Sequence, residues 1–211
     1  AVPAADSLFA GWSDGCAGSG ACVVRLDRAR AVQATFDLRP ASRSYYLAEG
    51  ATGSFFDLDI IVANPNDQDV PVDVMFLDKL GRTYSLNFTL QARHSRTVAV
   101  EREVPGLAAT DVSTVVTSTG GLPLIVERSL FWDATYYGGH TGSAVDGPST
   151  TWYFGEGFQS TPGVFDTFIL LANASATPAT ATPSFLRQGS TPVSTTVHVG
   201  ATSRANFWAA Q

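Results

Sequence analysis

The chain carries one motif twice: Tyr45-Tyr46-Leu47-Ala48-Glu49-Gly50 returns as Trp152-Tyr153-Phe154-Gly155-Glu156-Gly157. The strand-like segment that follows the first motif, 56–64 (FDLDIIVAN), returns as 165–173 (FDTFILLAN). The offset between matching residues is 107 at the motif (152 − 45) and 109 at the strand (165 − 56). A period of this size suits a β-sandwich domain and is too long for one turn of a solenoid. The sequence therefore predicts tandem copies of one sandwich module.

The match continues into the later part of each copy. Phe76-Leu77 reappears as Phe185-Leu186, Gly81 as Gly189, and Ser95-Arg96 as Ser203-Arg204, which aligns Arg96 with Arg204 at an offset of 108. Residues 101–147 have no counterpart, so the second copy holds only the first half of a module. Half a sandwich would expose strand edges and an apolar face. Two explanations stay open: the chain is a piece cut from a longer one, or a neighbour supplies the missing strands.

The composition is typical of an extracellular β-sheet protein. Apolar residues make up 45% of the 211 residues and charged residues only 15%, with 19 glycines and 11 prolines. The net charge of −6 argues against nucleic-acid binding and against docking on anionic lipid, both of which need a basic surface. No apolar run is long enough for a membrane-spanning helix, and no signal peptide is visible. We therefore expect a secreted or cell-surface protein.

Short alternating segments separated by turn residues predict strands throughout the first copy. The expected strands are 56–63, 70–77, 84–91, 96–101, 112–117 and 124–132, with a Gly-rich loop or irregular strand over 138–147. This pattern predicts an all-β fold of Ig-like, Greek-key β-sandwich modules. Segments 21–26 and 31–38 are expected to form a short N-terminal β-hairpin.

Cys16 and Cys22 are the only cysteines, and they lie in a Gly-rich loop. Their short spacing favours a local disulfide formed in an oxidising compartment. A reduced pair and a redox motif are the alternatives. Two thiols with no histidine nearby cannot complete a zinc site.

Two resemblances support this location. Residues 8–38 resemble the end of a small β-repeat common in bacterial surface proteins, through Phe9-Ala10-Gly11-Trp12-Ser13, the cysteine pair and Val32-Gln33-Ala34-Thr35-Phe36 (F-x-G-W-S, C-x5-C, V-x-A-x-F). Residues 45–211 resemble modules of unknown role in long secreted bacterial proteins, which open with W-Y-x-x-E-G and end a strand with L-x-N-P. Here Tyr45 replaces the tryptophan, Val62 the leucine and Ala174 the proline. These resemblances imply architecture and location, not a reaction.

Charged residues repeat with the module. Glu49 and Arg96 in the first copy, and Glu156 and Arg204 in the second, are expected to form structural charge pairs across strands. Within the apolar segment 124–132, one of the neighbours Glu127 and Arg128 must point inward, and Arg128 is a candidate partner for a buried carboxylate. Neither a G-x-S-x-G nor an H-E-x-x-H motif occurs, so no catalytic residue is predicted and the protein is not expected to be an enzyme.

Two binding sites are considered. The candidate ligands of a weakly bound calcium ion are Asp57, Asp59, Asp67 and Asp69, although the second copy lacks carboxylates at the corresponding turn. Turn formation is the alternative role for the last two. The candidates for stacking on a polysaccharide are Trp132, Tyr136, Tyr137 and Trp152. A packed seam between modules is the alternative for these aromatics.

The resulting hypothesis is a non-enzymatic, extracellular structural or adhesive protein in three parts. They are the end of the small β-repeat (1–40), copy one of the module (41–148) and an incomplete copy two (149–211). Its expected partners are further copies of itself or neighbouring modules, joined into a filament by strand exchange. The alternative is a carbohydrate-binding or accessory module of a larger secreted protein.

Overall fold

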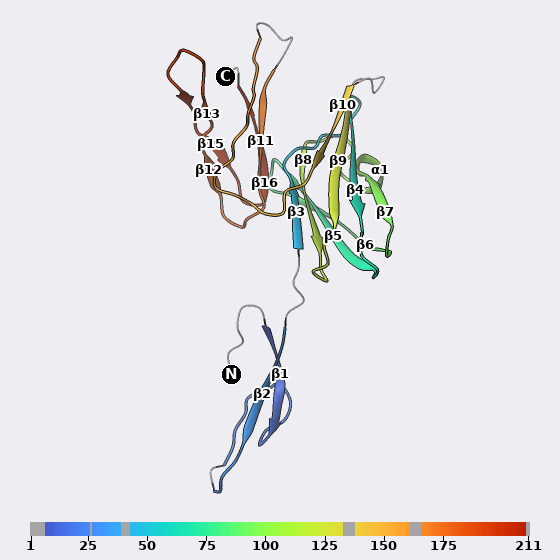
Figure 1. The fold of residues 1–211 in the computed structure, drawn as a ribbon, viewed down its shortest axis with the longest axis vertical. Helices are drawn as coiled ribbons and strands as arrows, with labels where there is room; N and C mark the ends of the chain where they lie inside the picture. The colour runs from blue at the N-terminus through green and yellow to red at the C-terminus, as the bar shows by residue number, and fades with distance from the viewer. Residues whose placement is uncertain (1–6, 26, 39–42, 133–137, 161–165, 210–211) are drawn as a thin grey trace. The chain divides into compact units, whose positions relative to one another are not determined.

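The computed structural model describes residues 7–25, 27–38, 43–132, 138–160 and 166–209 (Figure 1). The chain divides into two compact units, Ala1–Ala41 and Ser42–Gln211. Apart from the four-residue helix α1 (Val100–Glu103), the regular elements of the described residues are all β-strands. The predicted all-β fold is confirmed.

The first unit is built on one antiparallel strand pair. β1 (Ser7–Asp14) pairs with β2 (Val32–Leu38), with a bulge between Phe9 and Gly11. The expected strand at 21–26 is wrong, because β1 occupies the place beside β2 and residues 21–25 form a loop. Cys16 and Cys22 form the predicted disulfide. The loop is also tied to the sheet by the Trp12 indole, whose Nε1 donates to the Gly20 carbonyl at 2.8 Å.

Copy one is a closed sandwich of two four-stranded antiparallel sheets. The sheet orders are β10-β9-β4-β7 and β3-β8-β5-β6. The strands are β3 (Arg43–Leu47), β4 (Phe56–Ala63), β5 (Val70–Asp78), β6 (Thr83–Leu90), β7 (Ser95–Ala99), β8 (Val112–Ser118), β9 (Ile125–Trp132) and β10 (Gly138–Ser143). β4 and β5 each have a bonded neighbour on both sides, which places them inside their sheets.

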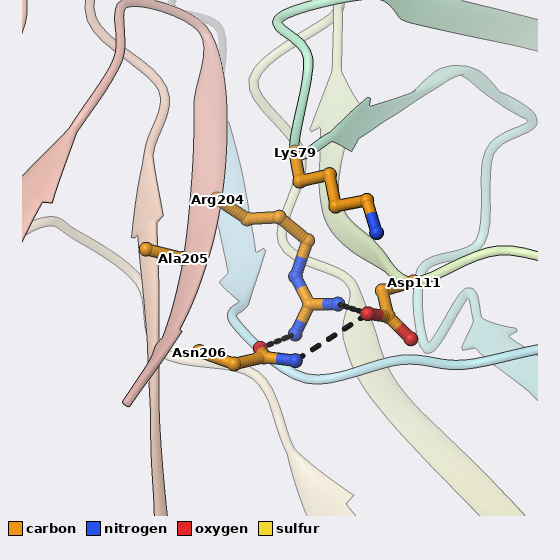
Figure 2. A pocket seen from close by; sticks show the side chains of 5 residues that line it. All are labelled: Lys79, Asp111, Arg204, Ala205 and Asn206. Atoms are coloured by element: carbon orange, nitrogen blue, oxygen red, sulfur yellow. Dashed lines mark hydrogen bonds and ion pairs between the residues drawn. The ribbon is translucent and has the colours of Figure 1, made fainter. Parts of the chain in front are cut away.

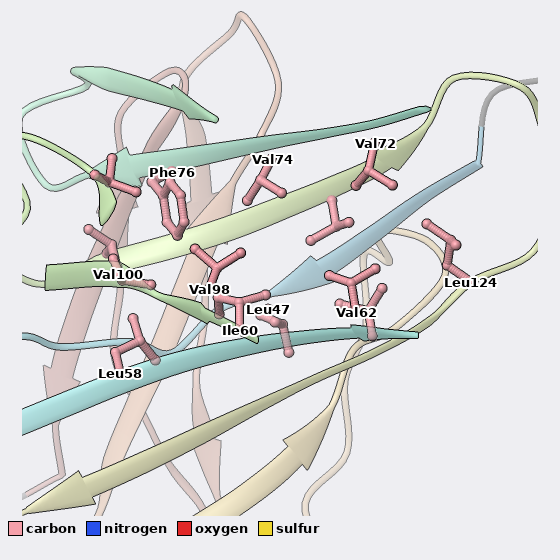
Figure 3. Close-up of a cluster of buried hydrophobic side chains, with 14 of the residues drawn as sticks. Leu47, Leu58, Ile60, Val62, Val72, Val74, Phe76, Val98, Val100 and Leu124 are labelled. Carbon is pink, nitrogen blue, oxygen red and sulfur yellow. The ribbon is translucent and has the colours of Figure 1, made fainter. Parts of the chain in front are cut away.

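The hydrophobic core lies between these two sheets. Alternate residues of β4 and β5 are fully buried, among them Leu58, Ile60 and Phe76. Figure 3 shows their side chains, with Val98 from β7, pointing into the space between the layers. Every buried member of this core cluster lies between Leu47 and Leu130, so the core belongs to copy one alone.

Copy two consists of three two-stranded pairs. They are β11 with β16 (Phe168–Asn173 and Ser203–Trp208), β12 with β15 (Ala179–Ala181 and Val197–Val199), and β13 with β14 (Ser184–Phe185 and Val193–Ser194). The last two pairs correspond to the continuous hairpin β5–β6. Pro183 stands where β5 has Val74 and lacks the N–H that a ladder needs, so the hairpin is split into two short pieces.

The two copies share strand register at one constant offset. Val70 pairs with Leu90 as Ala179 pairs with Val199, and Phe76 pairs with Tyr84 as Phe185 pairs with Val193. Both members of each pair are offset by 109 residues, as 199 − 90 and 193 − 84 illustrate. The turn before β7 has Arg93 at φ 60°, and the turn before β16 has Thr202 at φ 43°, which is again an offset of 109 (202 − 93).

This register corrects one part of the sequence alignment. At an offset of 109, Arg204 stands at the position of Ser95, and Ala205 stands at the position of Arg96. Neighbouring residues on a strand face opposite sides of the sheet, so Arg96 and Arg204 lie on opposite faces of their modules. The shared Ser-Arg dipeptide is therefore not a structural equivalence.

Candidate functional site

The open strand edges of copy two form the main candidate site. β11 pairs with β16 alone, whereas its counterpart β4 pairs with both β7 and β9. β12 and β13 pair with β15 and β14 alone, whereas their counterpart β5 pairs with β6 and β8. Among the described residues, no strand takes the place of β8 or β9 in copy two. Both edges therefore present backbone N–H and C=O groups that in copy one are bonded.

The inner face of copy two is less buried than that of copy one as a result, although Val199 is 4% exposed. Phe185 and Ile169 are only partly buried, although their counterparts Phe76 and Ile60 are fully buried. Phe154 is 73% exposed, against 4% for its counterpart Leu47. In copy one, Leu47 lies on β3, which pairs with β8. In copy two, the described residues provide no counterpart of β8, and residues 151–159 form no strand. The large apolar side chains exposed in copy two are Trp152, Tyr153, Phe154, Phe158, Phe168, Leu186, Val193 and Trp208.

Glu49 has an ion-pair partner that Glu156 lacks. The Glu49 carboxylate binds the guanidinium of Arg128 on β9, and His140 Nε2 on β10 lies 3.3 Å from the same oxygen, Oε2. Arg128 is buried; this burial lowers the pKa of its guanidinium, and Glu49 acts in the opposite sense. Of the two neighbours Glu127 and Arg128, one of which is expected to point inward, Arg128 is the buried one, and it pairs with the partly exposed carboxylate of Glu49. Glu156 is exposed and makes no hydrogen bond or ion pair with the residues that the structure describes.

The two arginines of the predicted charge pairs have different partners from those expected. Arg96 binds Glu103 at 2.6 Å, and its guanidinium lies 4.3 Å from the ring centre of Phe88. Arg204 is 4% exposed and lies against copy one. Its Nη1 is 3.7 Å from Asp111 Oδ2 and 3.4 Å from the Gly50 carbonyl oxygen. The contacts of Arg204 join residues far apart in the chain, and no local pattern in the sequence points to them.

Arg204 lines a small cavity where copy two meets copy one (Figure 2). The cavity measures about 270 Å³, and its lining residues are Lys79, Asp111, Arg204, Ala205 and Asn206. Figure 2 shows the guanidinium directed at Asp111, and Asn206 Oδ1 accepts a hydrogen bond from Arg204 Nη2 at 2.6 Å. Because Asp111 and Asn206 already bind this guanidinium, the cavity is a polar seam that holds β16 against copy one.

The four candidate calcium ligands fall into two separate places. Asp57 and Asp59 lie on β4, whereas Asp67 binds Arg93 at 2.8 Å and Asp69 accepts a hydrogen bond from the Ala92 N–H in the following turn. About six residues of strand, roughly 20 Å, separate Asp57 from the end of β4, and about four residues, roughly 13 Å, separate Asp59 from it. Within the described part of the chain, no three His, Cys, Asp or Glu side chains come together as a metal site requires. The structure therefore does not bring the four candidate ligands together in one site.

A partly buried group of carboxylates lies on β4 and α1. Burial, and then the neighbouring Asp57 charge, raise the pKa of Asp59. Burial, and then a hydrogen bond with Asp57, raise the pKa of Glu101. One oxygen of each, Asp59 Oδ1 and Glu101 Oε1, is buried without a hydrogen-bond partner. These groups do not line the cavity beside Arg204.

Two of the four candidate stacking aromatics, Trp132 and Trp152, lie among the described residues. Trp152 is 50% exposed, and its indole Nε1 donates to the Ser149 carbonyl at 3.2 Å. Trp132 is partly buried and packs against His140, with ring centres 5.7 Å apart. Tyr136 and Tyr137 lie outside the described residues. The exposed aromatic stretch is therefore 152–154, which includes Tyr153 at 91% exposure.

The one helix of the described residues, α1, has four residues, which is far too short to span a membrane.

No family model and no curated protein sequence matches the chain. Among solved structures, the chain is similar to Thermotoga maritima 1070, with 11% identity, 50% of this chain and 97% of that one covered, and a TM-score of 0.45. It is also similar to the Anabaena sensory rhodopsin transducer, with 20% identity, 41% and 93% coverage and a TM-score of 0.36. Neither similarity identifies a function for this chain.

Proposed function

We propose that this protein is a non-enzymatic structural or adhesive protein of the extracellular space, which self-associates by strand exchange between modules. One observation carries the proposal: copy two has the strands and register of copy one, yet two of its edges and its apolar face are open. A partner that adds strands to those edges would gain ladder hydrogen bonds and bury apolar surface together. The local disulfide Cys16–Cys22 and the low content of charged residues support the extracellular location.

Light scattering after gel filtration, with negative-stain microscopy of the same fractions, tests this proposal on the full chain. We expect oligomers or filaments whose length increases with protein concentration. A single species of 22.3 kDa at every concentration would contradict self-association.

A matched pair of variants identifies the surface responsible. Ile169→Asp places a charge on the open inner face and should abolish assembly, because a buried unpaired carboxylate is strongly unfavourable. Ala172→Asp places the same charge at an exposed position of the same strand and should leave assembly intact. Equal effects of the two substitutions would mean that the open face is not the contact surface.

A second candidate function is carbohydrate binding, which the exposed aromatics Trp152 and Tyr153 support. Aromatic faces stack on the apolar faces of sugar rings. Binding to a polysaccharide that is lost in Trp152→Ala, with an unchanged circular dichroism spectrum, is the expected result. An array of polysaccharides to which the chain does not bind would remove this candidate.

A further inference from the structure

Copy one reveals what covers the face that copy two leaves open. β9 pairs with β4 along its whole length, and β8 pairs with β5 from Val72↔Ser118 to Asp78↔Val112. β8 and β9 are consecutive in the chain, yet they belong to opposite sheets. One continuous segment, 112–132, therefore closes both sheets of the sandwich at once.

The constant offset transfers the register of that segment to copy two. Arg128 of β9 lies opposite Ile60, whose counterpart on β11 is Ile169. The buried neighbours of Arg128 on the same face of β9 are Val126 and Leu130. A strand with the sequence pattern and register of β9, bound along β11, would therefore place its arginine opposite Ile169, with apolar residues two positions away on each side.

Glu156 of copy two is a carboxylate that an arginine on such a strand could pair with. Glu156 occupies the place in its motif that Glu49 occupies in copy one, and Glu49 holds the buried Arg128 of β9. A carboxylate without a partner at this place is suited to a strand that brings an arginine, because a buried guanidinium is tolerated only when it is paired. The open edges supply affinity for any extended strand, and Glu156 adds selectivity for one with arginine.

We propose that copy two is an acceptor for the strand pair 112–132 of a second copy of this chain, whose inward arginine binds Glu156. This inference rests on the proposed function and names the chemistry of the partner. The described residues contain one segment of this type, and it is bound in copy one. A second copy of this chain donates its own segment by opening its own sandwich, as the strand exchange proposed above requires.

The test uses a synthetic peptide with the sequence of residues 110–132, titrated into the full chain and followed by calorimetry. Saturable binding with one peptide per chain is expected. The Arg128→Gln peptide should bind about tenfold more weakly, as expected for one desolvated ion pair. The Glu127→Gln peptide is the matched control, since Glu127 is exposed in copy one, and it should bind as tightly as the unmodified peptide. In the Glu156→Gln protein, the unmodified and Arg128→Gln peptides should bind alike.

A fusion protein provides a second test that does not depend on the solubility of the apolar peptide. The sequence of residues 110–147 is appended to Gln211 through a flexible linker, and hydrogen exchange is measured over β11 (Phe168–Asn173). Slow exchange at β11 in the fusion, and fast exchange in the unextended chain, are expected when both are measured below the concentration of self-association. Absence of saturable peptide binding together with fast exchange at β11 in the fusion would overturn the proposal, as would equal losses for the Arg128→Gln and Glu127→Gln peptides.

The outcomes separate this inference from the proposed function. If the peptide binds but the unmodified chain stays monomeric, the acceptor site stands and self-association falls. If the chain forms filaments that excess peptide neither caps nor shortens, self-association stands through another surface and the acceptor site falls.

Discussion

Copies one and two have the same framework of strands, but only copy one encloses a core. The framework is the pair β4–β7 with the hairpin β5–β6, and copy two repeats both as β11–β16 and β12–β15 with β13–β14. The described residues of copy two include no counterpart of segment 112–132, which in copy one adds a strand to each sheet. Strand register and burial therefore depend on different residues of the module.

Register depends on a turn that both copies contain. Asn64 donates from Nδ2 to the carbonyls of Gln68, Leu90 and Gln91, and Asn173 donates in the same way to Thr177 and Gly200. These contacts join the end of one strand to the turn before its partner. Their presence in the open copy means that they need no closed core.

The largest expected difference concerns the aromatic residue that the two copies share. Phe76→Ala removes a fully buried ring from copy one and should lower the free energy of unfolding by about 4 kcal/mol. Phe185→Ala removes a ring that already contacts solvent and should cost about 1 kcal/mol or less. Urea denaturation measures the first effect, and hydrogen exchange over β13 measures the second.

These measurements are made on dilute, monomeric protein, because a bound partner would bury Phe185. Equal losses of about 4 kcal/mol for both variants would mean that copy two has a closed core in the isolated chain. That result would remove the difference on which the comparison rests.

The second difference concerns the glutamate of the repeated motif. Glu49→Gln leaves the buried Arg128 guanidinium without its carboxylate and should cost about 3 kcal/mol, somewhat reduced because the Glu49 side chain is 29% exposed. Glu156→Gln should change stability by an amount too small to measure, since Glu156 has no ionic partner among the described residues. Denaturant midpoints of the two variants provide the check, and a large loss for Glu156→Gln would contradict it.

Much of this architecture can be predicted from the sequence. Alternation of apolar residues predicts β4 and β9 within one residue of their observed ends, and predicts that one of the neighbours Glu127 and Arg128 points inward. Both features depend on the two-residue period of a strand, which is local information. The disulfide between Cys16 and Cys22 was also within reach of local reasoning.

Other features depend on contacts between separate segments of the chain, which the sequence pattern does not show. The alignment of Arg96 with Arg204 followed the letters of a dipeptide, whereas the hydrogen bonds of Asn64 and Asn173 set the true register one residue away. β1 was overlooked as the partner of β2 because Gly11 and its bulge interrupt the alternation. The candidate calcium ligands Asp59 and Asp67 are close in sequence but lie apart, because strand β4 extends between them.

The third prediction tests whether the turn acts alike in both copies. Asn64→Ala removes three buried or partly buried hydrogen bonds and should cost about 2 kcal/mol. Asn173→Ala removes the equivalent contacts at an exposed site and should cost about 1 kcal/mol, seen as faster exchange over β11 and β16. Loss of β11 protection in Asn173→Ala without loss of copy one's stability is the expected pattern. Unchanged exchange at β11 would mean that the turn does not fix register in copy two.

The smallest expected effect uses pH to distinguish the copies. Burial and the Asp57 charge raise the pKa of Asp59 in the folded state above its unfolded value, so the folded state binds a proton more tightly than the unfolded chain. This group therefore destabilises copy one at pH values above its folded pKa, and the penalty disappears as the pH falls through that pKa. Asp59→Asn should raise the free energy of unfolding by about 0.5 kcal/mol at pH 7 and by less at pH 3.

Copy two provides the internal control for this last measurement, because Phe168 stands where copy one has Asp59. Exchange over β11 should therefore be the same in Asp59→Asn and in the parent protein at both pH values, while exchange over β4 slows at pH 7 only. A gain in stability that is equal at pH 3 and pH 7 would show that the substitution acts through packing rather than through the charge. A change at β11 would show that the electrostatics of copy one extend across the seam at Arg204, and the two copies would then have to be treated as one cooperative unit.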